Sequence, residues 1–295
     1  MSLFRHNSAL QSVKYIQRKK RVFIISITLI FFCLLLFILN ILLFSRLPFI
    51  QISTINIESS NHISKEEIEK DIFTYFDQKY FNIIPKSSII FLSKNIIKQI
   101  LLDKYKIINN LSIKRNGLSS ITIKIDERTP RAIVCDGFRG DDTPDNCFFS
   151  DYKGYIYDRA LKEDIENNQY NKYYVPSTNK AISAGISFID EIRFNKIESF
   201  LSGIIQNGLS PLGVLIGENG EYEMYLKNDF MKEATTTRDI TVYFDDKIPF
   251  ENTLSNLVTF WKDAVIKNRN ANAPVFDSIN LHFGNTVYYS KQNNE

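Results

Sequence analysis

The strongest constraint in this sequence is an uninterrupted apolar segment near its N-terminus. Residues 22–44 contain no charged side chain over 23 positions. As a helix rising 1.5 Å per residue, this segment is roughly 34 Å long, which is enough to cross the hydrocarbon core of a bilayer. Asn40 is its one strongly polar residue and lies near the end, within reach of the interface. The segment therefore predicts a transmembrane helix.

Basic residues flank this segment almost entirely on one side. Residues 1–21 contain no carboxylate and six cations, which are Arg5, Lys14, Arg18, Lys19, Lys20 and Arg21. Only Arg46 follows the segment closely. The positive-inside rule therefore predicts a cytoplasmic tail at 1–21 and an extracytoplasmic location for everything after the helix. We expect a single-pass protein of the cell (inner, cytoplasmic) membrane, in contact with the lipid bilayer.

A cleaved signal peptide is the alternative interpretation of the same segment. Its apolar region would normally span about 7–15 residues and end in small residues at a cleavage site. Here the apolar run is longer, and Leu43-Phe44-Ser45-Arg46 offers no such site. The sequence favours an uncleaved anchor.

The composition of the whole chain allows a packed globular core. Hydrophobic residues make up 44% of the 295 and charged residues 23%, which is close to ordinary globular usage. The net charge of +3 is too small to indicate nucleic acid as a partner.

The segment directly after the anchor has the pattern of a compact α+β unit. Alternating isoleucines predict a strand, with one interruption, over 49–58. Ser64 and Glu67 form a capping box that begins a helix, and a second helix is expected to begin near Ser93. Two further strands follow at 106–115 and 119–127, with Asn116-Gly117 as the turn between them. The predicted order is β-α-α-β-β.

The pattern of the remaining chain predicts a mostly antiparallel β domain with flanking helices. Residues 147–157 predict a strand–turn–strand with Gly154 in the turn, and the polar, Asn-rich residues 158–187 predict a long connecting loop. The other expected elements are a helix at 189–205, strands at 211–217, 221–227 and 239–244, a helix at 250–267 and a closing hairpin at 276–289. Residues 291–295 form a short tail.

Three segments resemble the FtsQ/DivIB family of bacterial cell division proteins. Ile125-Asp126-Glu127-Arg128-Thr129-Pro130-Arg131-Ala132, which ends the β-α-α-β-β unit, is similar to the end of that family's POTRA domain. Residues 147–157 resemble its "D-x-x-G-x-v-f" strand–turn–strand. Residues 276–289 resemble its closing hairpin, with Asn280 where Asp is usual and His282 where Arg is usual.

The resemblance implies a domain order and a function. It implies a POTRA domain at 49–128 and an extracytoplasmic β domain at 129–290. The family members are divisome scaffolds at the division septum, which recruit and regulate partners without making or breaking bonds. Their expected partners are the bitopic FtsB (DivIC)-like and FtsL-like proteins, which dock at an edge of the β domain.

The last strand is the expected docking edge in this chain. A terminal strand often lies at a sheet edge, where unpaired N–H and C=O groups can template a strand of another chain. Carried over by match, the interface candidates are Phe283, Val287, Tyr288 and Tyr289. Core packing is the other interpretation of these apolar side chains.

The three cysteines have two different expected roles. Cys33 lies within the apolar run and is expected to pack there as a small hydrophobe. Cys135 and Cys147 lie twelve positions apart in the part expected outside the cytoplasm, where disulfides persist, and the residues between them are polar and turn-rich. We predict a disulfide between them, with two free thiols as the alternative. A zinc site is disfavoured because neither a second Cys pair nor a nearby His completes four ligands.

Motifs of enzyme chemistry are missing from the sequence. It contains no G-x-S-x-G, P-loop, G-x-G-x-x-G or H-E-x-x-H. The histidines are His6, His62 and His282, and we expect His282 to be a surface residue of its strand. The acidic cluster of Asp141, Asp142 and Asp145 lacks EF-hand spacing and predicts a solvated loop. We therefore expect a protein that is not an enzyme and uses no metal, cofactor or small-molecule substrate.

Two alternatives belong to other functional classes. Another POTRA-bearing membrane assembly factor, such as an outer-membrane translocation component, would need a long C-terminal β-barrel, and the residues after the predicted POTRA domain are too few. A membrane-anchored cell-wall enzyme would need a nucleophile or metal motif. Activity of the extracytoplasmic part on peptidoglycan would identify the second.

Overall fold

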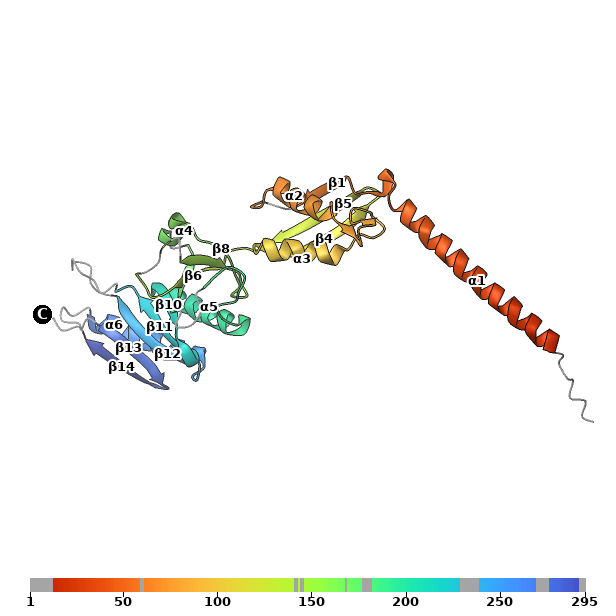
Figure 1. The fold of residues 1–295 in the computed structure, drawn as a ribbon. Helices are drawn as coiled ribbons and strands as arrows, with labels where there is room; N and C mark the ends of the chain where they lie inside the picture. Colours follow the sequence, from red (N-terminus) through yellow and green to blue (C-terminus); the bar gives the residue numbers. More distant parts are fainter. Residues whose placement is uncertain are drawn as a thin grey trace, which may run out of the picture. The chain divides into compact units, whose positions relative to one another are not determined.

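The computed structural model describes residues 13–58, 61–140, 143, 146–167, 169–176, 182–228, 239–268 and 276–291, with only the backbone of 13–16 and 265–268. The chain divides into two compact units (Figure 1). The first unit contains Met1–Asp103 and Asn110–Asp126, and the second contains Lys104–Asn109 and Glu127–Glu295.

The N-terminal apolar segment forms the helix α1 (Val13–Phe44). Within the described residues, Gln17–Phe44 is the one helical stretch long and apolar enough to cross a membrane. Its apolar side chains are exposed on the isolated chain, as Phe37 illustrates at 66%. The predicted N-terminal apolar helix is confirmed, and it begins earlier than the charge-free segment, within the basic region.

The rest of the first unit contains a three-stranded sheet and two helices. The elements are β1 (Thr54–Glu58), α2 (Lys65–Phe76), β2 (Lys79–Tyr80), β3 (Ile84–Pro85), α3 (Lys94–Lys104), β4 (Ile108–Asn116) and β5 (Ser120–Glu127). The sheet order is β1-β5-β4, with β1 parallel to β5. The small hairpin β2–β3 stands apart as a two-stranded sheet, which the sequence did not predict.

Local sequence signals explain where several of these elements begin or end. The Ser64 hydroxyl accepts a hydrogen bond from the Glu67 N–H, 3.4 Å away, and so begins α2 as expected. Gly117 has a φ of 75°, which suits glycine in the turn between β4 and β5. The strand predicted at 49–58 is too long. Pro48 instead begins a 3-10 turn that ends at Ile50, and β1 starts only at Thr54.

The second unit is built on one mostly antiparallel sheet of nine strands. In the order of the sheet, the strands run β14-β13-β12-β11-β10-β9-β6-β7-β8. Their bounds are β6 (Ala132–Asp136), β7 (Cys147–Ser150), β8 (Ile156–Arg159), β9 (Asn171–Val175), β10 (Pro211–Ile216), β11 (Glu221–Leu226), β12 (Ile240–Asp245), β13 (Phe276–Phe283) and β14 (Thr286–Lys291). Three neighbouring pairs are parallel, namely β6 with β9, β9 with β10, and β12 with β13. The predicted α+β class with a mostly antiparallel sheet is confirmed.

The expectation of a connecting loop at 158–187 is wrong for much of that segment. It contains the end of β8, the short helix α4 (Lys162–Glu166) and β9, which lies inside the sheet between β6 and β10. β9 was not predicted because its segment is rich in asparagine. Only Tyr173 and Tyr174 supply its buried side chains, and polar residues flank them. Residues 168 and 177–181 of this segment lie outside the described residues.

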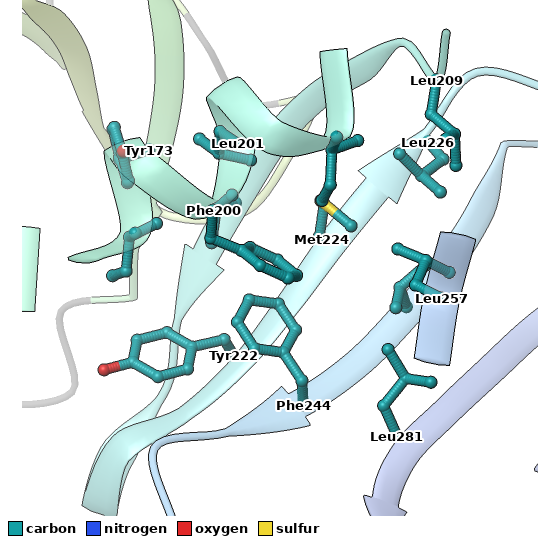
Figure 2. Close-up of a cluster of buried hydrophobic side chains, with 14 of the residues drawn as sticks. Tyr173, Phe200, Leu201, Leu209, Tyr222, Met224, Leu226, Phe244, Leu257 and Leu281 are labelled. Carbon is teal, nitrogen blue, oxygen red and sulfur yellow. The ribbon is translucent and has the colours of Figure 1, made fainter. Parts of the chain in front are cut away.

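Two helices cover one face of the sheet and enclose the main core. These are α5 (Glu191–Gln206) and α6 (Phe250–Asn268). Figure 2 shows Phe200 of α5 beside Phe244 of β12, which lies next to Tyr222 of β11. The Phe200 and Phe244 rings are tilted with centroids 4.9 Å apart, and the Tyr222 and Phe244 rings stack with centroids 5.2 Å apart. Alternate residues of each strand point to this core because side chains on a strand alternate between faces. A smaller cluster, with Ile165 of α4, lies on the opposite face.

Both arginines of the segment Glu127-Arg128-Thr129-Pro130-Arg131 are anchored within the second unit. The Arg128 guanidinium forms an ion pair with Asp151, whose side chain is 1% exposed. It also lies over the Tyr155 ring, 4.0 Å from the ring centroid. The Arg131 Nε lies 2.8 Å from the buried Glu198 carboxylate on α5. Two segments that carry the family resemblance, at 125–132 and 147–157, are therefore bonded to each other through Arg128 and Asp151.

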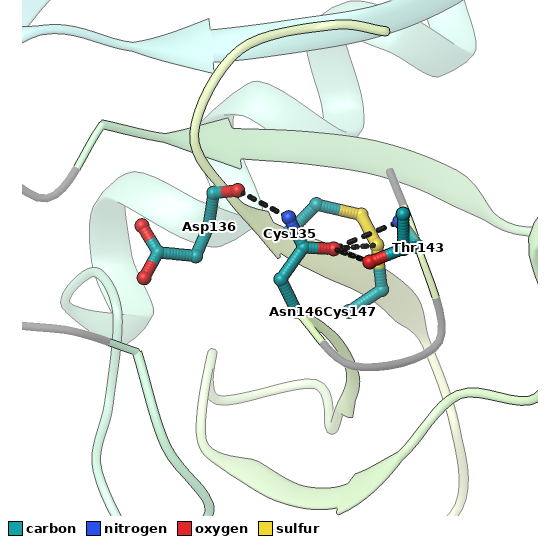
Figure 3. Close-up of a disulfide and its surroundings, with 5 residues drawn as sticks. All are labelled: Cys135, Asp136, Thr143, Asn146 and Cys147. Carbon is teal, nitrogen blue, oxygen red and sulfur yellow. Dashed lines mark hydrogen bonds between the residues drawn. A yellow bond between two sulfur atoms is a disulfide. The ribbon is translucent and has the colours of Figure 1, made fainter. Parts of the chain in front are cut away.

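Cys135 and Cys147 form a disulfide between β6 and β7. They are directly opposite each other in the register of the two strands, and both are fully buried. Figure 3 shows Asn146 beside the bridge, where its amide donates to the Asp136 carbonyl (2.8 Å) and accepts from the Thr143 N–H (2.8 Å). Asp141, Asp142 and Asp145 of the connecting loop lie outside the described residues.

Removal of this disulfide is expected to destabilise the second unit. Closure of a loop with a sequence separation of 12 stabilises the fold by roughly 3 kcal/mol in the loop-entropy model. We expect Cys135→Ala/Cys147→Ala to lower the free energy of unfolding by about that amount, measured by denaturant titration of the full chain in detergent. Alanine is chosen because both sites are buried and apolar. An unchanged unfolding midpoint, or one that a reductant does not lower in the native chain, would refute the stabilising role.

Candidate partner-binding edge

The two ends of the nine-stranded sheet differ in how they are protected. At one end, β8 is covered by residues 185–188, which bond to its outer side. The Gly185 N–H donates to the Ile156 carbonyl (2.8 Å), and the Ile156 N–H donates to the Ile186 carbonyl (2.8 Å). The Phe188 N–H donates to the Gly154 carbonyl (3.1 Å). This segment covers the first residue of β8 and the turn that precedes it.

The other end of the sheet is β14, which pairs only with β13 among the described residues. It runs for six residues, and five of them have exposed side chains. A strand in this position presents a row of unpaired N–H and C=O groups, which proteins usually shield with charge, proline, bulges or a covering segment. Within Thr286–Lys291, only Lys291 carries a charge, and no residue is proline. Among the described residues, β14 is therefore an edge strand of the sheet, and its pairing with β13 contains two register shifts.

Phe283 and Tyr288 form an exposed aromatic pair on one side of this edge. Their ring centroids lie 4.9 Å apart in an edge-to-face arrangement. Phe283 is 58% exposed and Tyr288 is 56% exposed, so more than half of each side chain is open to solvent. They share a face because the register of β13 against β14 shifts between Asn280 and Phe283. This face is the one opposite α5 and α6, and we call it the outer face.

Val287 and Tyr289 point to the helix side of the same strand. Tyr289 packs against Phe260 of α6 and Phe276 of β13, at ring-centroid distances of 5.4 Å and 5.3 Å, and it is 49% exposed. Val287 is partly buried against the main core. The four candidates therefore divide between two faces, and Val287 contributes to packing. A substitution at Val287 would disturb the core as well as the edge.

The turn that precedes β14 is held in place by α6. Gly284 has a φ of 63°, and its carbonyl accepts a hydrogen bond from the Asn256 amide (2.5 Å). Across the hairpin, the Ser278 and Ser290 hydroxyls bond to each other at 2.7 Å. These contacts fix the direction of the edge strand before any partner binds.

His282 lies on β13, next to the register shift of the last hairpin. Its side chain is only partly exposed, and its Nε2 is buried with no hydrogen-bond partner among the described residues. Its backbone N–H donates to the Asn280 side-chain oxygen (3.0 Å), within the strand that pairs with β14.

Tyr243 of β12 and Tyr225 of β11 also lie on the outer face. They were not among the candidates predicted from the sequence. Tyr243 pairs with Asn280 on one side and with Glu223 on the other, and Tyr225 follows on β11. Burial raises the pKa of Tyr225 to about 12, and the Glu223 carboxylate adds to the shift. Burial, then Glu223 and Asp277, also raise the pKa of Tyr243. Both phenols are therefore neutral hydrogen-bond donors near neutral pH. The alternation of side chains along β11 and β12 was the sequence signal that places these tyrosines on the outer face.

Metal binding and ligand binding are the alternatives to partner binding in the described part of the chain. The described residues contain no group of three His, Cys, Asp or Glu side chains that could hold a metal ion. A groove of about 800 Å³ lies between the first turns of α5 and α6, and its lining mixes apolar residues such as Ile192 and Phe250 with charges of both signs, without His or Cys. The β14 edge offers backbone pairing and aromatic contact area, which are the two components of strand addition.

Comparison with known proteins does not assign this chain to a family. The sequence matches no protein-family model, and no curated protein is significantly similar to it.

Proposed function

We propose that this chain is a bitopic scaffold of the bacterial division septum, of the kind represented by FtsQ and DivIB. The observation that carries the proposal is the β14 edge with its exposed aromatic pair, Phe283 and Tyr288, at the end of a sheet whose other edge strand is bonded at its start to residues 185–188. The family resemblance of the sequence supplies the biological setting.

The order of elements in the first unit supports this proposal. After the apolar helix, the chain forms β1, α2, α3, β4 and β5, which is the β-α-α-β-β order expected of a POTRA domain. The β2–β3 hairpin is an addition between the two helices. The contact of Arg128 with Asp151 also supports treating the resembling segments as parts of one architecture.

The proposed mechanism is capture of a partner by strand addition. A segment of an FtsB (DivIC)-like or FtsL-like bitopic protein pairs with the outer side of β14, and its backbone satisfies the free N–H and C=O groups. Phe283 and Tyr288 then cover the apolar side chains of the partner on the outer face. Tyrosine suits this role because it buries a large area with little loss of rotamer entropy. The chain positions its partners at the membrane, and no bond is made or broken.

Localisation tests the septal role directly. A fluorescent protein fused to the N-terminus is expected to form a band at mid-cell in dividing cells. Uniform fluorescence around the membrane would contradict the proposal.

Protease accessibility tests the orientation. In intact spheroplasts, added protease should degrade the part after Phe44 and leave the N-terminal tag, because six cations hold the tail in the cytoplasm. Full protection of the large C-terminal part would show the reverse orientation.

A further inference from the structure

The tip of the β2–β3 hairpin combines full exposure with an unusual backbone conformation. Phe81 is 92% exposed and has a φ of 49°, and Asn82 beside it has a φ of 58°. The Ile83 N–H donates to the Tyr80 carbonyl (3.0 Å), which closes a tight turn with two left-handed central residues. Such turns favour Asn-Gly or Asp-Gly, because a bulky side chain at positive φ is strained.

The fold gains almost nothing from the Phe81 side chain. A ring that is 92% exposed makes few contacts within its own chain, so internal packing does not offset the strain. Asparagine or glycine at the same position would form the same turn at lower cost. We therefore expect the Phe81 ring to make its contacts with a surface outside the chain.

A hydrogen bond fixes this hairpin close to the end of α1. The Arg46 guanidinium donates to the Ile83 carbonyl at 3.1 Å. Arg46 follows the last residue of α1, Phe44, by two positions, which span at most about 7 Å of extended chain. If α1 crosses a membrane, this covalent limit keeps Arg46 and the hairpin tip near the membrane surface, whatever the direction of the helix.

Backbone bonds next to the hairpin reinforce this placement. The Ile52 N–H donates to the Ser87 carbonyl (2.9 Å), and the Ile89 N–H donates to the Ile50 carbonyl (2.9 Å). The chain that leaves β3 is thereby joined to the chain that leaves α1. The hairpin and the end of α1 therefore belong to one structural connection.

The neighbourhood of the tip has the composition of a membrane interface. Exposed apolar side chains with relative exposures of 36–51% lie at the end of α1 and beside the tip, and these are Phe44, Leu47, Phe49 and Ile83. Cations surround them, since Arg46, Lys79 and Lys86 lie at or beside the hairpin, against one nearby acid in sequence, Asp77. Aromatic residues favour the level of the headgroups, and cations favour anionic lipid surfaces.

We propose that the β2–β3 hairpin is a second membrane contact, in which Phe81 and Ile83 insert into the headgroup–acyl boundary of the leaflet from which the end of α1 emerges. The occupant of this surface is the lipid bilayer, because the surface continues from the segment that leaves the bilayer and carries a matching positive charge. This contact goes beyond the proposed function. It requires α1 to span the membrane, and it requires neither the β14 edge nor a septal location.

Lipid quenching of tryptophan fluorescence tests the insertion. The full chain is reconstituted into phosphatidylglycerol/phosphatidylethanolamine vesicles with brominated acyl chains, and the signal of the unsubstituted chain, from the buried Trp261, is subtracted. We expect Phe81→Trp to lose at least half of its emission. Phe37→Trp, within α1, is the positive control, and Lys124→Trp, an exposed site on β5, is the negative control.

Each outcome of this experiment bears on the proposal. Quenching at position 81 well above that at 124 supports insertion. Equal, weak quenching at 81 and 124, together with strong quenching at 37, would overturn the hairpin contact while leaving the membrane span. Weak quenching at 37 would overturn the span itself and the hairpin contact with it. Partner binding at the β14 edge is measured separately, and loss of the hairpin contact alone leaves it unaffected.

A second variant separates anchoring from folding. Phe81→Asn removes the ring and suits the positive φ, so the unfolding midpoint should stay the same or rise. In this background, quenching of a tryptophan at Ile83 should fall at least twofold relative to the same tryptophan with Phe81 intact. A lowered unfolding midpoint with unchanged quenching would show that Phe81 is a structural residue instead.

Discussion

Replacement of Phe283 and Tyr288 by alanine is expected to weaken binding of the proposed bitopic partner by about 100-fold or more. This factor corresponds to about 2.7 kcal/mol, within the range that one or two aromatic anchors contribute to an interface. The two rings touch each other and are each more than half exposed, so they offer a ready contact surface on the outer face. Binding is measured by titration of the reconstituted full chain with the purified partner.

The same double substitution should change stability only slightly. An exposed edge-to-face pair contributes about 0.5–1.5 kcal/mol beyond its burial, so the unfolding midpoint should shift little. Tyr152→Ala is the matched control, because Tyr152 is an exposed tyrosine (46%) in the turn between β7 and β8, toward the covered edge. Native affinity in the double variant, or an equal loss in the Tyr152→Ala chain, would argue against the β14 edge.

Loss of the ion pair between Arg128 and Asp151 should have the largest effect on stability. Asp151 is almost fully buried, and its second carboxylate oxygen accepts from the Lys153 N–H (2.8 Å) and the Tyr155 N–H (3.1 Å). Asp151→Ala removes all of these bonds and leaves the Arg128 guanidinium without its anion. Breaking a buried pair in this way typically costs about 3–5 kcal/mol. We expect a decrease of that size in the free energy of unfolding.

An exposed ion pair on the same unit provides the control for this experiment. Lys162 and Glu166 are separated by 3.6 Å, and their side chains are 75% and 66% exposed. Glu166→Ala should therefore cost no more than about 0.5 kcal/mol. Comparable losses for Asp151→Ala and Glu166→Ala would show that the Arg128–Asp151 contact does not hold the strand–turn–strand in place.

The sequence predicted the elements whose signals are local. The capping serine of α2, the turn at Gly117 and the alternation in β10, β11 and β12 each depend on neighbouring residues, and the structure has them within a few positions. The apolar run likewise determined α1. The disulfide followed from spacing and polarity of the intervening residues, and the two cysteines lie opposite each other on paired strands.

Features that depend on contacts between distant segments could not be predicted in this way. β9 became a strand inside the sheet because β6 and β10 both pair with it, although its flanks are polar. Phe283 and Tyr288 share a face only because of a register shift in the last hairpin. Val287 faces the core because it alternates with Tyr288 along β14, and which of the two faces is buried depends on the pairing with β13. The Phe81 turn contradicts local preference outright, and such a conflict is often found at a functional surface.

Site-specific photocrosslinking at Tyr288 in living cells tests the central claim most directly. A benzophenone amino acid at position 288 should form a light-dependent adduct with one small single-span membrane protein, identified by mass spectrometry as FtsB (DivIC)-like or FtsL-like. The same amino acid at position 152 should not form it. Absence of this adduct at 288, in cells where the chain accumulates normally, would contradict partner capture at the β14 edge.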